Sequence, residues 1–232
     1  MNLCPQLRQL EFLSEIKMTT KFLYIADPMC SWCYGFGLEL QQFLADKPDA
    51  ELDIVLGGLR AYNTQVMDAD QKDMILSHWE KVRKVSGLPF DMSGLDKPGF
   101  IYDTEPACRA VVAAKLLTDC MPTKINFAVF QAIQHAFYAE GKDITKEAVL
   151  AEIAVAALNE YEQSEIFDVD SFLETLSSAE CKDETRQHFQ QIQRWGVRGF
   201  PVLLLVREDG LHMLSSGYTK AGDLTLALNE IV

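Results

Sequence analysis

The sequence lacks the features that mark membrane proteins and nucleic-acid-binding proteins. No apolar run in its 232 residues approaches the length needed to cross a bilayer. Positive charge is not in excess, since the formal net charge is −13, and a polyanion such as nucleic acid is therefore a poor partner. Low-complexity stretches and internal repeats are missing as well. We expect neither a membrane nor a nucleic acid among the partners of this chain.

The N-terminal residues also lack the pattern of a secretory signal. Glu11, Glu15 and Lys17 interrupt what would be its apolar core, and no small-residue cleavage site follows. We therefore treat residues 1–18 as an N-terminal extension. The expected location is the cytoplasm, where thiols are kept reduced.

A metal site is not expected either. A structural zinc site needs four ligands at matching spacing, and the chain has a single CxxC motif, Cys30-Ser31-Trp32-Cys33. The histidines are scattered singly, and each is expected on the surface or as a satisfied core residue: His78, His135, His188 and His212. The cysteines outside the motif are irregularly spaced and are interpreted as small buried thiols without structural disulfides: Cys4, Cys108, Cys120 and Cys181.

What is present is an alternation of strand and helix patterns at both ends of the chain. Apolar strand formers at residues 22–26 lead to the CxxC motif, and residues at helical spacing follow it as far as Lys47. A second strand is predicted over 52–56. Further strands are predicted over 202–206 and 211–214, joined by the turn signal Glu208-Asp209-Gly210, and a helix over 220–232.

Between these parts the pattern is helical almost throughout, from about residue 65 to 194. Apolar residues recur there at helical spacing, which favours packed helices over a cofactor site. The predicted buried faces are Ile75, Trp79 and Val82; Ala107, Val111, Ala114 and Leu117; Phe127, Phe130 and Phe137; and Val149, Ile153 and Ala156. Two more helices are predicted over 170–178 and 183–195. The order of elements indicates an α/β fold with an all-helical insertion.

The CxxC motif lies between a predicted strand and a predicted helix, which suits dithiol chemistry. Cysteines three residues apart on a first helical turn can form a disulfide. Backbone N–H groups and the helix dipole favour a thiolate at the first position, Cys30. The second position, Cys33, lies one turn inward and is suited to resolving a mixed disulfide.

A proline at the start of the third predicted strand is the second notable feature. It ends the run Gly196-Val197-Arg198-Gly199-Phe200-Pro201. Proline is tolerated at the first residue of a strand, and an ordinary trans peptide bond there is the simplest interpretation.

These two segments resemble the DsbA-like branch of the thioredoxin superfamily, and most of all its cytoplasmic, FrnE-like members. The resemblance runs from Asp27-Pro28-Met29-Cys30 through Trp32-Cys33-Tyr34-Gly35-Phe36 to the segment 196–201, and covers the chain from about Thr20 to its end. It implies a thioredoxin-like fold with a large all-helical insertion between the second and third strands. The domain parts expected from it are 19–62, 63–195 and 196–232.

The resemblance also implies roles for individual residues. Cys30 becomes the nucleophile, Cys33 the resolving cysteine, and Pro201 a cis-proline that lies against the pair. Trp32, Phe200 and Arg60 are expected at the substrate-binding cleft, although Arg60 fits a solvated surface residue equally well. Thr104, before Glu105-Pro106, is predicted to be the N-cap of an insertion helix.

The predicted function is a thiol–disulfide oxidoreductase that acts on protein or small-thiol disulfides. No bound cofactor is expected, and glutathione or a thioredoxin-type protein is the candidate reductant. Periplasmic DsbA proteins carry a histidine between the cysteines, whereas this chain has Ser31-Trp32, which favours a reductase or isomerase over a strong oxidase. The alternative is a glutathione-dependent transferase or isomerase of the kappa-class or hydroxychromene carboxylate isomerase type, in which serine usually replaces Cys30. A third possibility is a peptide-binding module with a redox-sensitive CxxC.

Overall fold

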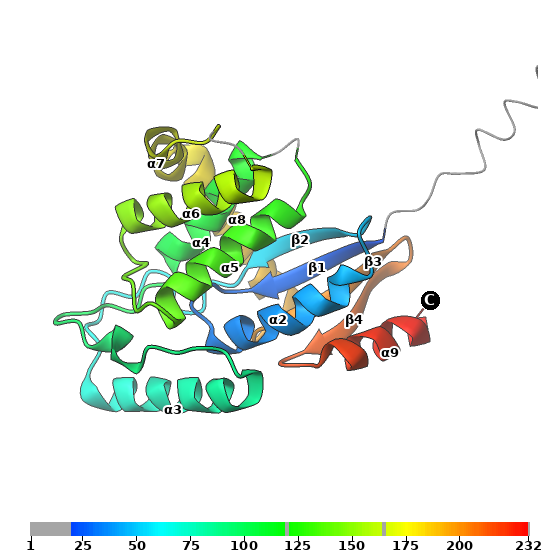
Figure 1. Cartoon of the computed structure of the whole chain (residues 1–232), viewed down its shortest axis with the longest axis horizontal. Helices are drawn as coiled ribbons and strands as arrows, with labels where there is room; N and C mark the ends of the chain where they lie inside the picture. The colour runs from blue at the N-terminus through cyan, green and yellow to red at the C-terminus, as the bar shows by residue number, and fades with distance from the viewer. Residues whose placement is uncertain (1–19, 119–120, 164–165, 232) are drawn as a thin grey trace, which may run out of the picture.

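The computed structural model describes residues 20–118, 121–163 and 166–231. The elements follow in the order β1 (Lys21–Ala26), α2 (Ser31–Ala45), β2 (Glu51–Leu56), α3 (Ala69–Ser86), the 3₁₀ turn η1 (Met92–Leu95), α4 (Glu105–Leu117), α5 (Lys124–Tyr138), α6 (Glu147–Glu162), α7 (Val169–Ser177), α8 (Ala179–Trp195), β3 (Val202–Arg207), β4 (Gly210–Ser216) and α9 (Ala221–Ile231). The fold is the predicted α/β arrangement, with helices α3 to α8 inserted between β2 and β3 (Figure 1).

The four strands form one mixed sheet in the order β2-β1-β3-β4. Strand β1 pairs in parallel with β2 and antiparallel with β3, and β3 and β4 form the predicted hairpin. Both faces of β1 are buried, because Phe22 and Tyr24 point into the main core while Leu23 and Ile25 join Ile192 of α8 in a smaller cluster. This burial on both sides explains why β1 reads as a continuous apolar run rather than an alternating one.

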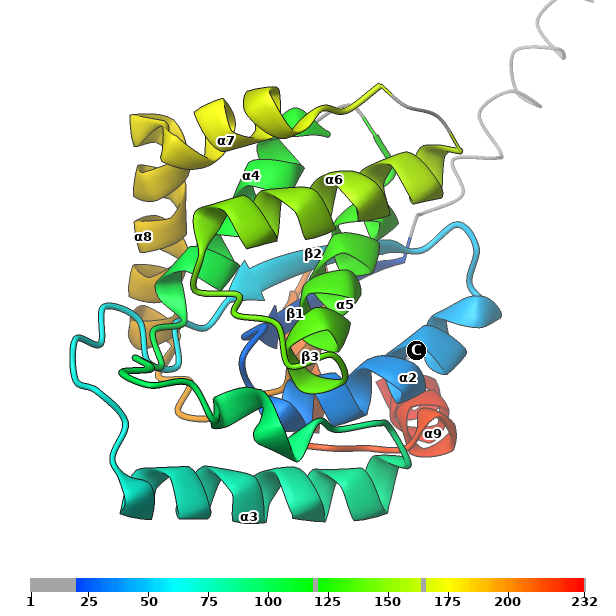
Figure 2. The same ribbon diagram turned by 60° about the vertical axis from the view of Figure 1, so that its left-hand side comes forward.

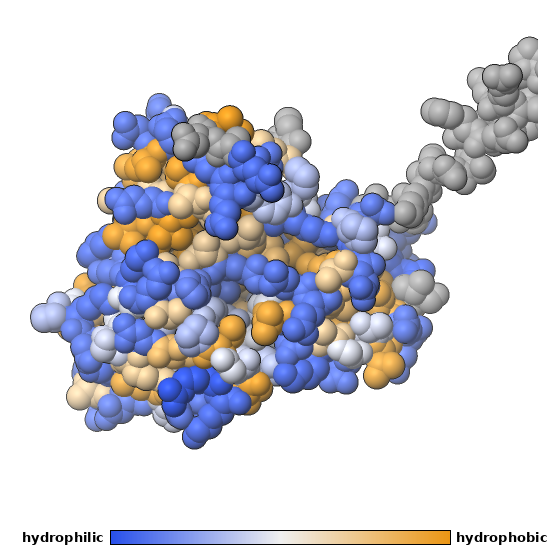
Figure 3. Space-filling view, viewed as in Figure 1, coloured by the Kyte–Doolittle hydropathy of each residue, from blue (hydrophilic) through white to orange (hydrophobic). Residues whose placement is uncertain are grey.

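Helices α2 and α9 lie on one face of the sheet together with the inserted helix α5, and the inserted helix α8 covers the opposite face. Helices α2 and α9 run side by side, and α2 also packs against α3 and α5 (Figures 1 and 2). Apolar side chains show between polar ones at the upper left of the molecule, over helices α6 and α7 (Figures 1 and 3). The N-terminal end of α2, and with it the CxxC motif, therefore lies where sheet and insertion meet.

The buried faces of three inserted helices agree with the sequence pattern, and one does not. Ile75, Trp79 and Val82 are buried, as are the three phenylalanines of α5. On α6 the predicted face of Val149, Ile153 and Ala156 is wrong, since Ala156 is exposed and the buried residues are Leu150, Ala151, Ala154, Val155 and Leu158. The apolar residues of α6 extend around most of its circumference, so that spacing alone does not define which stripe is buried.

The helices around residue 180 also differ from the prediction at one boundary. Helix α8 begins at Ala179 rather than at residue 183, because Ser178 caps it through a hydrogen bond from Cys181 N–H (3.1 Å). At the other end, Gly196 has φ 68° and stops α8 after Trp195. This stop directs the chain into the segment that carries Phe200 and Pro201. None of the helices in the described residues is both long and apolar enough to cross a membrane.

Candidate active site

Cys30 occupies the N-cap position of α2, with extended backbone angles of φ −93° and ψ 115°. Its N–H donates to the carbonyl of Asp27 (3.0 Å), and its own carbonyl accepts from Tyr34 N–H (3.1 Å). The first turn of α2 contains no acidic side chain. The unpaired N–H groups and the positive end of the helix dipole therefore lie beside the Cys30 sulfur without a competing carboxylate on the same turn.

Cys33 lies in the first turn of α2 and is fully buried, whereas Cys30 retains 8% of its surface. Burial raises the pKa of the Cys33 thiol well above its ordinary value, and the neighbouring Cys30 adds to the shift. Tyr24 Oη donates to the Cys33 carbonyl (3.4 Å) and joins this turn to β1. Both cysteines are free thiols in this structure.

The segment before β3 comes back to the cysteine pair. The peptide bond between Phe200 and Pro201 is cis, the isomer that the resemblance implies. The Cys30 thiol donates a long hydrogen bond to the Phe200 carbonyl oxygen (Sγ–O 3.9 Å). Pro201 itself is buried, and its carbonyl accepts from Gly217 N–H (2.7 Å) at the end of β4.

A cavity of about 240 Å³ opens beside Cys30. It is bounded by the start of α2, the loop after β2, one face of α3, Tyr102 and Phe200. Its lining residues are Met29, Cys30, Ser31, Trp32, Leu59, Arg60, Ile75, His78, Trp79, Tyr102 and Phe200. The structure thus brings Trp32, Arg60 and Phe200 together around the Cys30 thiol, whereas Pro201 is not among the residues that line this cavity.

Arg60 is held in this wall by neighbours on both sides. Its guanidinium carbon lies 5.5 Å from the centre of the Tyr102 ring. The backbone N–H of Arg60 donates to Thr104 Oγ1 (3.2 Å). Thr104 is the N-cap residue of α4 as predicted, but its hydroxyl makes no capping hydrogen bond and serves the Arg60 loop instead.

Asp27 is the residue of this site that the sequence did not identify. It is fully buried, and its two carboxylate oxygens accept from Met29 N–H (2.8 Å) and Leu59 N–H (2.7 Å). Burial raises the pKa of Asp27, although these hydrogen bonds oppose the rise. Asp27 therefore joins the loop before Cys30 to the loop that carries Arg60. The contact with Met29, two residues on, is an Asx-turn, and an aspartate between a strand and a helix start is the local signal for it.

The described cysteines outside the motif are buried thiols. Cys108 Sγ donates to Asp27 Oδ2 (3.6 Å) and Cys181 Sγ donates to the Arg109 carbonyl (3.5 Å). Both are free and fully buried, as predicted, while Cys4 and Cys120 fall outside the described residues. Among the described residues, no group of three or more His, Cys, Asp or Glu side chains is placed to hold a metal ion.

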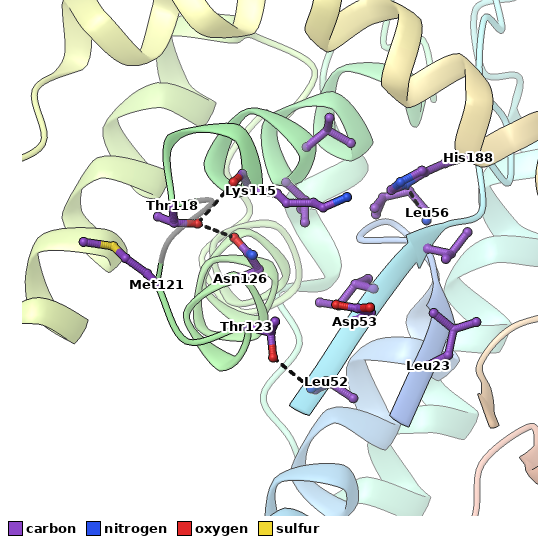
Figure 4. A pocket seen from close by; sticks show the side chains of 14 residues that line it. Leu23, Leu52, Asp53, Leu56, Lys115, Thr118, Met121, Thr123, Asn126 and His188 are labelled. Atoms are coloured by element: carbon purple, nitrogen blue, oxygen red, sulfur yellow. Dashed lines mark hydrogen bonds between the residues drawn. The ribbon is translucent and has the colours of Figure 1, made fainter. Parts of the chain in front are cut away.

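A second cavity, also of about 240 Å³, lies along the outer edge of β2, between α4, α5 and α8 (Figure 4). Here two side chains accept hydrogen bonds from backbone N–H groups of β2 that an edge strand would otherwise expose to solvent. Thr123 Oγ1 accepts from Leu52 N–H (2.9 Å), and His188 Nδ1 accepts from Leu56 N–H (3.3 Å). His188 is thus a satisfied core histidine, as predicted, and these contacts close the edge of the sheet rather than forming reactive chemistry.

Comparisons with known proteins agree with this geometry. A family model described as DSBA-like thioredoxin domain matches residues 24–217. The chain belongs to the DSBA-like thioredoxin family.

Several solved structures are similar to this chain over almost its whole length. A proposed protein disulfide isomerase from Nitrosomonas europaea is 31% identical, with a TM-score of 0.78 over 91% of this chain and 97% of that one. The cytosolic disulfide reductase DsbM from Pseudomonas aeruginosa is 26% identical, with a TM-score of 0.70 over 91% and 98%, and a structure of DsbM with GSH is similar (25%, 0.69). A 2-hydroxychromene-2-carboxylate isomerase, 14% identical with a TM-score of 0.61 over 91% and 95%, shares the fold alone. No curated protein sequence matches the chain.

Proposed function

We propose that this DSBA-like protein is a thiol–disulfide oxidoreductase that works as a reductase or isomerase through Cys30 and Cys33. The observation that carries the proposal is the contrast between the two thiols. Cys30 faces a cavity at a helix N-terminus, while Cys33 is fully buried one turn on, where burial raises its pKa. One thiol is accessible to a substrate disulfide, and the other stays protonated until the first has reacted.

The proposed reaction proceeds in two exchanges. The Cys30 thiolate attacks one sulfur of the substrate disulfide, which forms a Cys30–substrate mixed disulfide and releases the other sulfur as a thiolate. Cys33 then loses its proton and attacks Cys30 Sγ, which frees the second substrate thiol and leaves a Cys30–Cys33 disulfide. In isomerisation, a different thiolate of the same substrate attacks the substrate sulfur of the mixed disulfide, which forms a new substrate disulfide and releases Cys30 as a thiolate.

For net reduction, a thiol reductant must return the Cys30–Cys33 disulfide to the dithiol. Glutathione or a thioredoxin-type protein is proposed for this step. The structure of the DsbM relative with GSH supports glutathione, and the cytosolic DsbM supports a cytoplasmic location for this chain. Detection of the protein in an exported fraction of its cell would contradict that location.

Trp32, Arg60, Phe200 and Pro201 are proposed to bind the substrate. Three of them line the cavity at Cys30, and Arg60 supplies a positive charge there. The wall contains no acidic side chain, although the chain as a whole has a net charge of −13. The cavity therefore favours disulfides that carry a carboxylate near the reacting sulfur.

Trapping tests the order of the two exchanges. The Cys33→Ser variant is expected to accumulate a mixed disulfide on Cys30 when it meets an oxidised peptide, because the resolving thiol is missing. Cys30→Ser is the matched control and should trap nothing. Intact-mass spectrometry before and after dithiothreitol distinguishes the adduct from other modifications. A stable adduct on Cys33 in the Cys30→Ser variant, and none on Cys30, would show that the roles are reversed.

The same variants separate the proposed function from a glutathione-dependent transferase or isomerase. A dithiol enzyme needs both cysteines for disulfide reduction. A transferase that uses bound glutathione keeps its activity when Cys33 is replaced. Full turnover by Cys33→Ser with glutathione and an electrophilic substrate would favour the transferase.

A further inference from the structure

Trp32 lines the cavity and also contacts Tyr218, a residue that is not part of the cavity lining. One part of its side chain lines the cavity beside Cys30. Its ring also packs against Tyr218, with ring centres 6.2 Å apart and planes inclined by 60°. Tyr218 lies in the loop between β4 and α9, 186 positions from Trp32 along the chain.

Tyr218 is fixed in place by a buried carboxylate of α2. Tyr218 Oη donates to Glu39 Oε1 (2.8 Å). Lys220 Nζ donates to the same oxygen (2.6 Å) and to Tyr218 Oη (2.8 Å), while Ala221 N–H donates to Glu39 Oε2 (3.0 Å). Burial disfavours ionisation of Glu39, but these hydrogen bonds outweigh burial and lower the pKa of Glu39. Glu39 is thus an ionised anchor for the whole loop.

The geometry of α2 places the anchor and the tryptophan on the same side. Trp32 and Glu39 are seven residues apart, which is two helical turns, so their side chains lie on one face of α2. Tyr218 fills the space above this face between them. Its preceding residue, Gly217, donates its N–H to the Pro201 carbonyl (2.7 Å). Tyr218 therefore connects α2, the start of α9 and the Pro201 segment at one point.

We propose that Tyr218 is a positioning residue, which holds Trp32 in place as a wall of the substrate cavity. This inference rests on the proposed function of Cys30 and Cys33, and extends it to residues that do not touch the reacting sulfurs. Because Trp32 lines an open cavity, its packing against the Tyr218 ring is a contact that restrains its position in the cavity wall. When that contact is removed, the cavity wall loosens while Cys30 keeps its place at the N-cap.

The prediction is therefore a change in substrate binding without a change in thiol reactivity. Pre-reduced protein is mixed with oxidised glutathione, and the rate of Cys30–Cys33 disulfide formation is measured against its concentration. Tyr218→Leu should raise the half-saturating concentration about threefold to tenfold, the range that an aromatic contact of this kind is worth. The maximal rate and the rate of Cys30 alkylation by iodoacetamide should stay close to those of the unmodified protein.

A second variant separates the effect of the Tyr218 ring from that of its hydrogen bond to Glu39, and a third serves as the control. Tyr218→Phe keeps the contact with Trp32 and loses the hydrogen bond to Glu39, so its effect should be smaller than that of Tyr218→Leu. Tyr161→Leu is the matched control, because Tyr161 is a partly exposed tyrosine on α6, away from the CxxC motif, and its loss should leave the half-saturating concentration unchanged.

The position of Trp32 is followed directly by fluorine NMR on protein labelled with 5-fluorotryptophan. Its resonance is assigned with a Trp32→Phe variant. Tyr218→Leu should shift and broaden this resonance, and Tyr218→Phe should shift it less. If Tyr218→Leu does not fold, the shift of the Trp32 resonance is measured in the Tyr218→Phe and Glu39→Gln variants instead.

The outcomes distinguish this inference from the proposed function. An unmoved Trp32 resonance, or a moved resonance with unchanged half-saturation, overturns the positioning role. Equal effects on half-saturation from Tyr218→Leu and Tyr161→Leu also overturn it, because they indicate general destabilisation. If the unmodified protein does not react with oxidised glutathione and Cys33→Ser traps no peptide, the proposed function fails, while the Trp32 resonance still reports whether Tyr218 holds the ring.

Discussion

The thiol of Cys30 lies 3.9 Å from the carbonyl oxygen of Phe200, and the two residues are 170 positions apart in the chain. This contact brings the end of the helical insertion back to the start of α2. The Cys30 sulfur therefore lies between the N-terminus of α2 and the backbone at Phe200. In the proposed reaction, a substrate disulfide approaches Cys30 beside this backbone segment.

The burial of the cysteines predicts the order in which they are alkylated. Cys30 should react first with iodoacetamide at pH 7, because burial raises the pKa of Cys33 and Cys108 well above the ordinary value and that of Cys181 to about 12. Peptide mapping after short exposure measures the order. The experiment uses a background with Cys4→Ser and Cys120→Ser, so that every remaining cysteine is one whose burial is known. Faster labelling of Cys108 than of Cys30 would contradict the assignment of roles.

Gly57 predicts how closely the Phe200 ring must fit. A Cβ atom added at Gly57 would lie 2.7 Å from Cε1 and Cε2 of Phe200 and closer still to Cζ. Gly57→Ala should therefore displace the ring from the cavity wall and slow disulfide exchange, with a loss of stability of about 1–3 kcal/mol from overpacking. Stopped-flow oxidation and urea unfolding measure the two effects.

Gly199→Ala is the control for this prediction, because a Cβ atom there meets nothing within 4 Å. It lies next to Phe200 but leaves the ring free, so its exchange rate should match that of the unmodified protein. A Gly57→Ala variant with normal exchange would show that the Phe200 ring is not part of the substrate site.

The charge at Arg60 predicts a preference among small disulfides. Arg60→Gln should slow exchange with oxidised glutathione, which carries carboxylates, more than exchange with uncharged hydroxyethyl disulfide. The expected difference is about threefold to tenfold, since exposed ion pairs and hydrogen bonds to charged groups contribute modestly in water. Arg194→Gln on the exposed last turn of α8 serves as the charge-matched control. Equal slowing of both disulfides by Arg60→Gln would indicate a structural role instead.

Much of this architecture follows from local sequence patterns, and the rest depends on contacts that the sequence does not pair. The strands, the β3–β4 hairpin and the position of the CxxC motif follow from apolar runs and turn residues that act within a few positions. The cis peptide bond before Pro201 was expected only from the resemblance to the DsbA-like family, because the residues alone favour an ordinary trans bond. The predicted buried face of α6 is wrong, because a helix that is apolar around most of its circumference has no single stripe that spacing can identify as buried.

Asp27 and Tyr218 show what local patterns miss. Asp27 looks like the polar end of a strand, and its role depends on Leu59 N–H, which is 32 positions away. Tyr218 and Glu39 look like ordinary surface residues until α9 folds back onto α2, 179 positions later. Sequence spacing within one helix or strand carries no information on such pairs, so only the assembled fold identifies them.

His188 predicts a loss of stability in mild acid. Burial, with the nearby charge of Lys115, lowers the pKa of His188 from 6.5 to about 4. As the pH falls from 6.5 toward 4, the unfolded chain takes up a proton that the folded chain does not, so the free energy of unfolding decreases. The contribution is about 3 kcal/mol at about 1.4 kcal/mol per pKa unit; it is fully present above pH 6.5 and is lost progressively as the pH falls toward 4.

Urea unfolding at pH 7.0 and pH 4.5 measures this contribution. His188→Gln should be less stable at pH 7.0, because its packing at the β2 edge changes, but should lose less stability on acidification than the unmodified protein. His135→Gln is the control, since it makes the same replacement at an exposed histidine, so the two variants compare a buried with an exposed position. An identical fall in the unmodified and His188→Gln proteins would show that other groups account for the acid sensitivity.

The environment of Cys30 predicts the direction of the reaction. A strong oxidase stabilises its reduced thiolate, and each 30 mV of reduction potential corresponds to about 1.4 kcal/mol for this two-electron couple. Here the two residues between the cysteines, Ser31 and Trp32, are uncharged, and the Phe200 carbonyl accepts a hydrogen bond that a thiol can donate and a thiolate cannot. The helix N-terminus and Arg60 favour the thiolate. Among the hydrogen bonds of the described residues, however, neither of them donates to the Cys30 sulfur. We therefore expect a potential of roughly −270 to −180 mV, between those of thioredoxin and the disulfide isomerases.

Equilibration in glutathione buffers, followed by alkylation and mass spectrometry, measures this potential, with Cys33→Ser as the control that forms no internal disulfide. A value near the roughly −120 mV of DsbA would mean that the cavity stabilises the thiolate far more than these contacts imply, and the protein would then act as an oxidase.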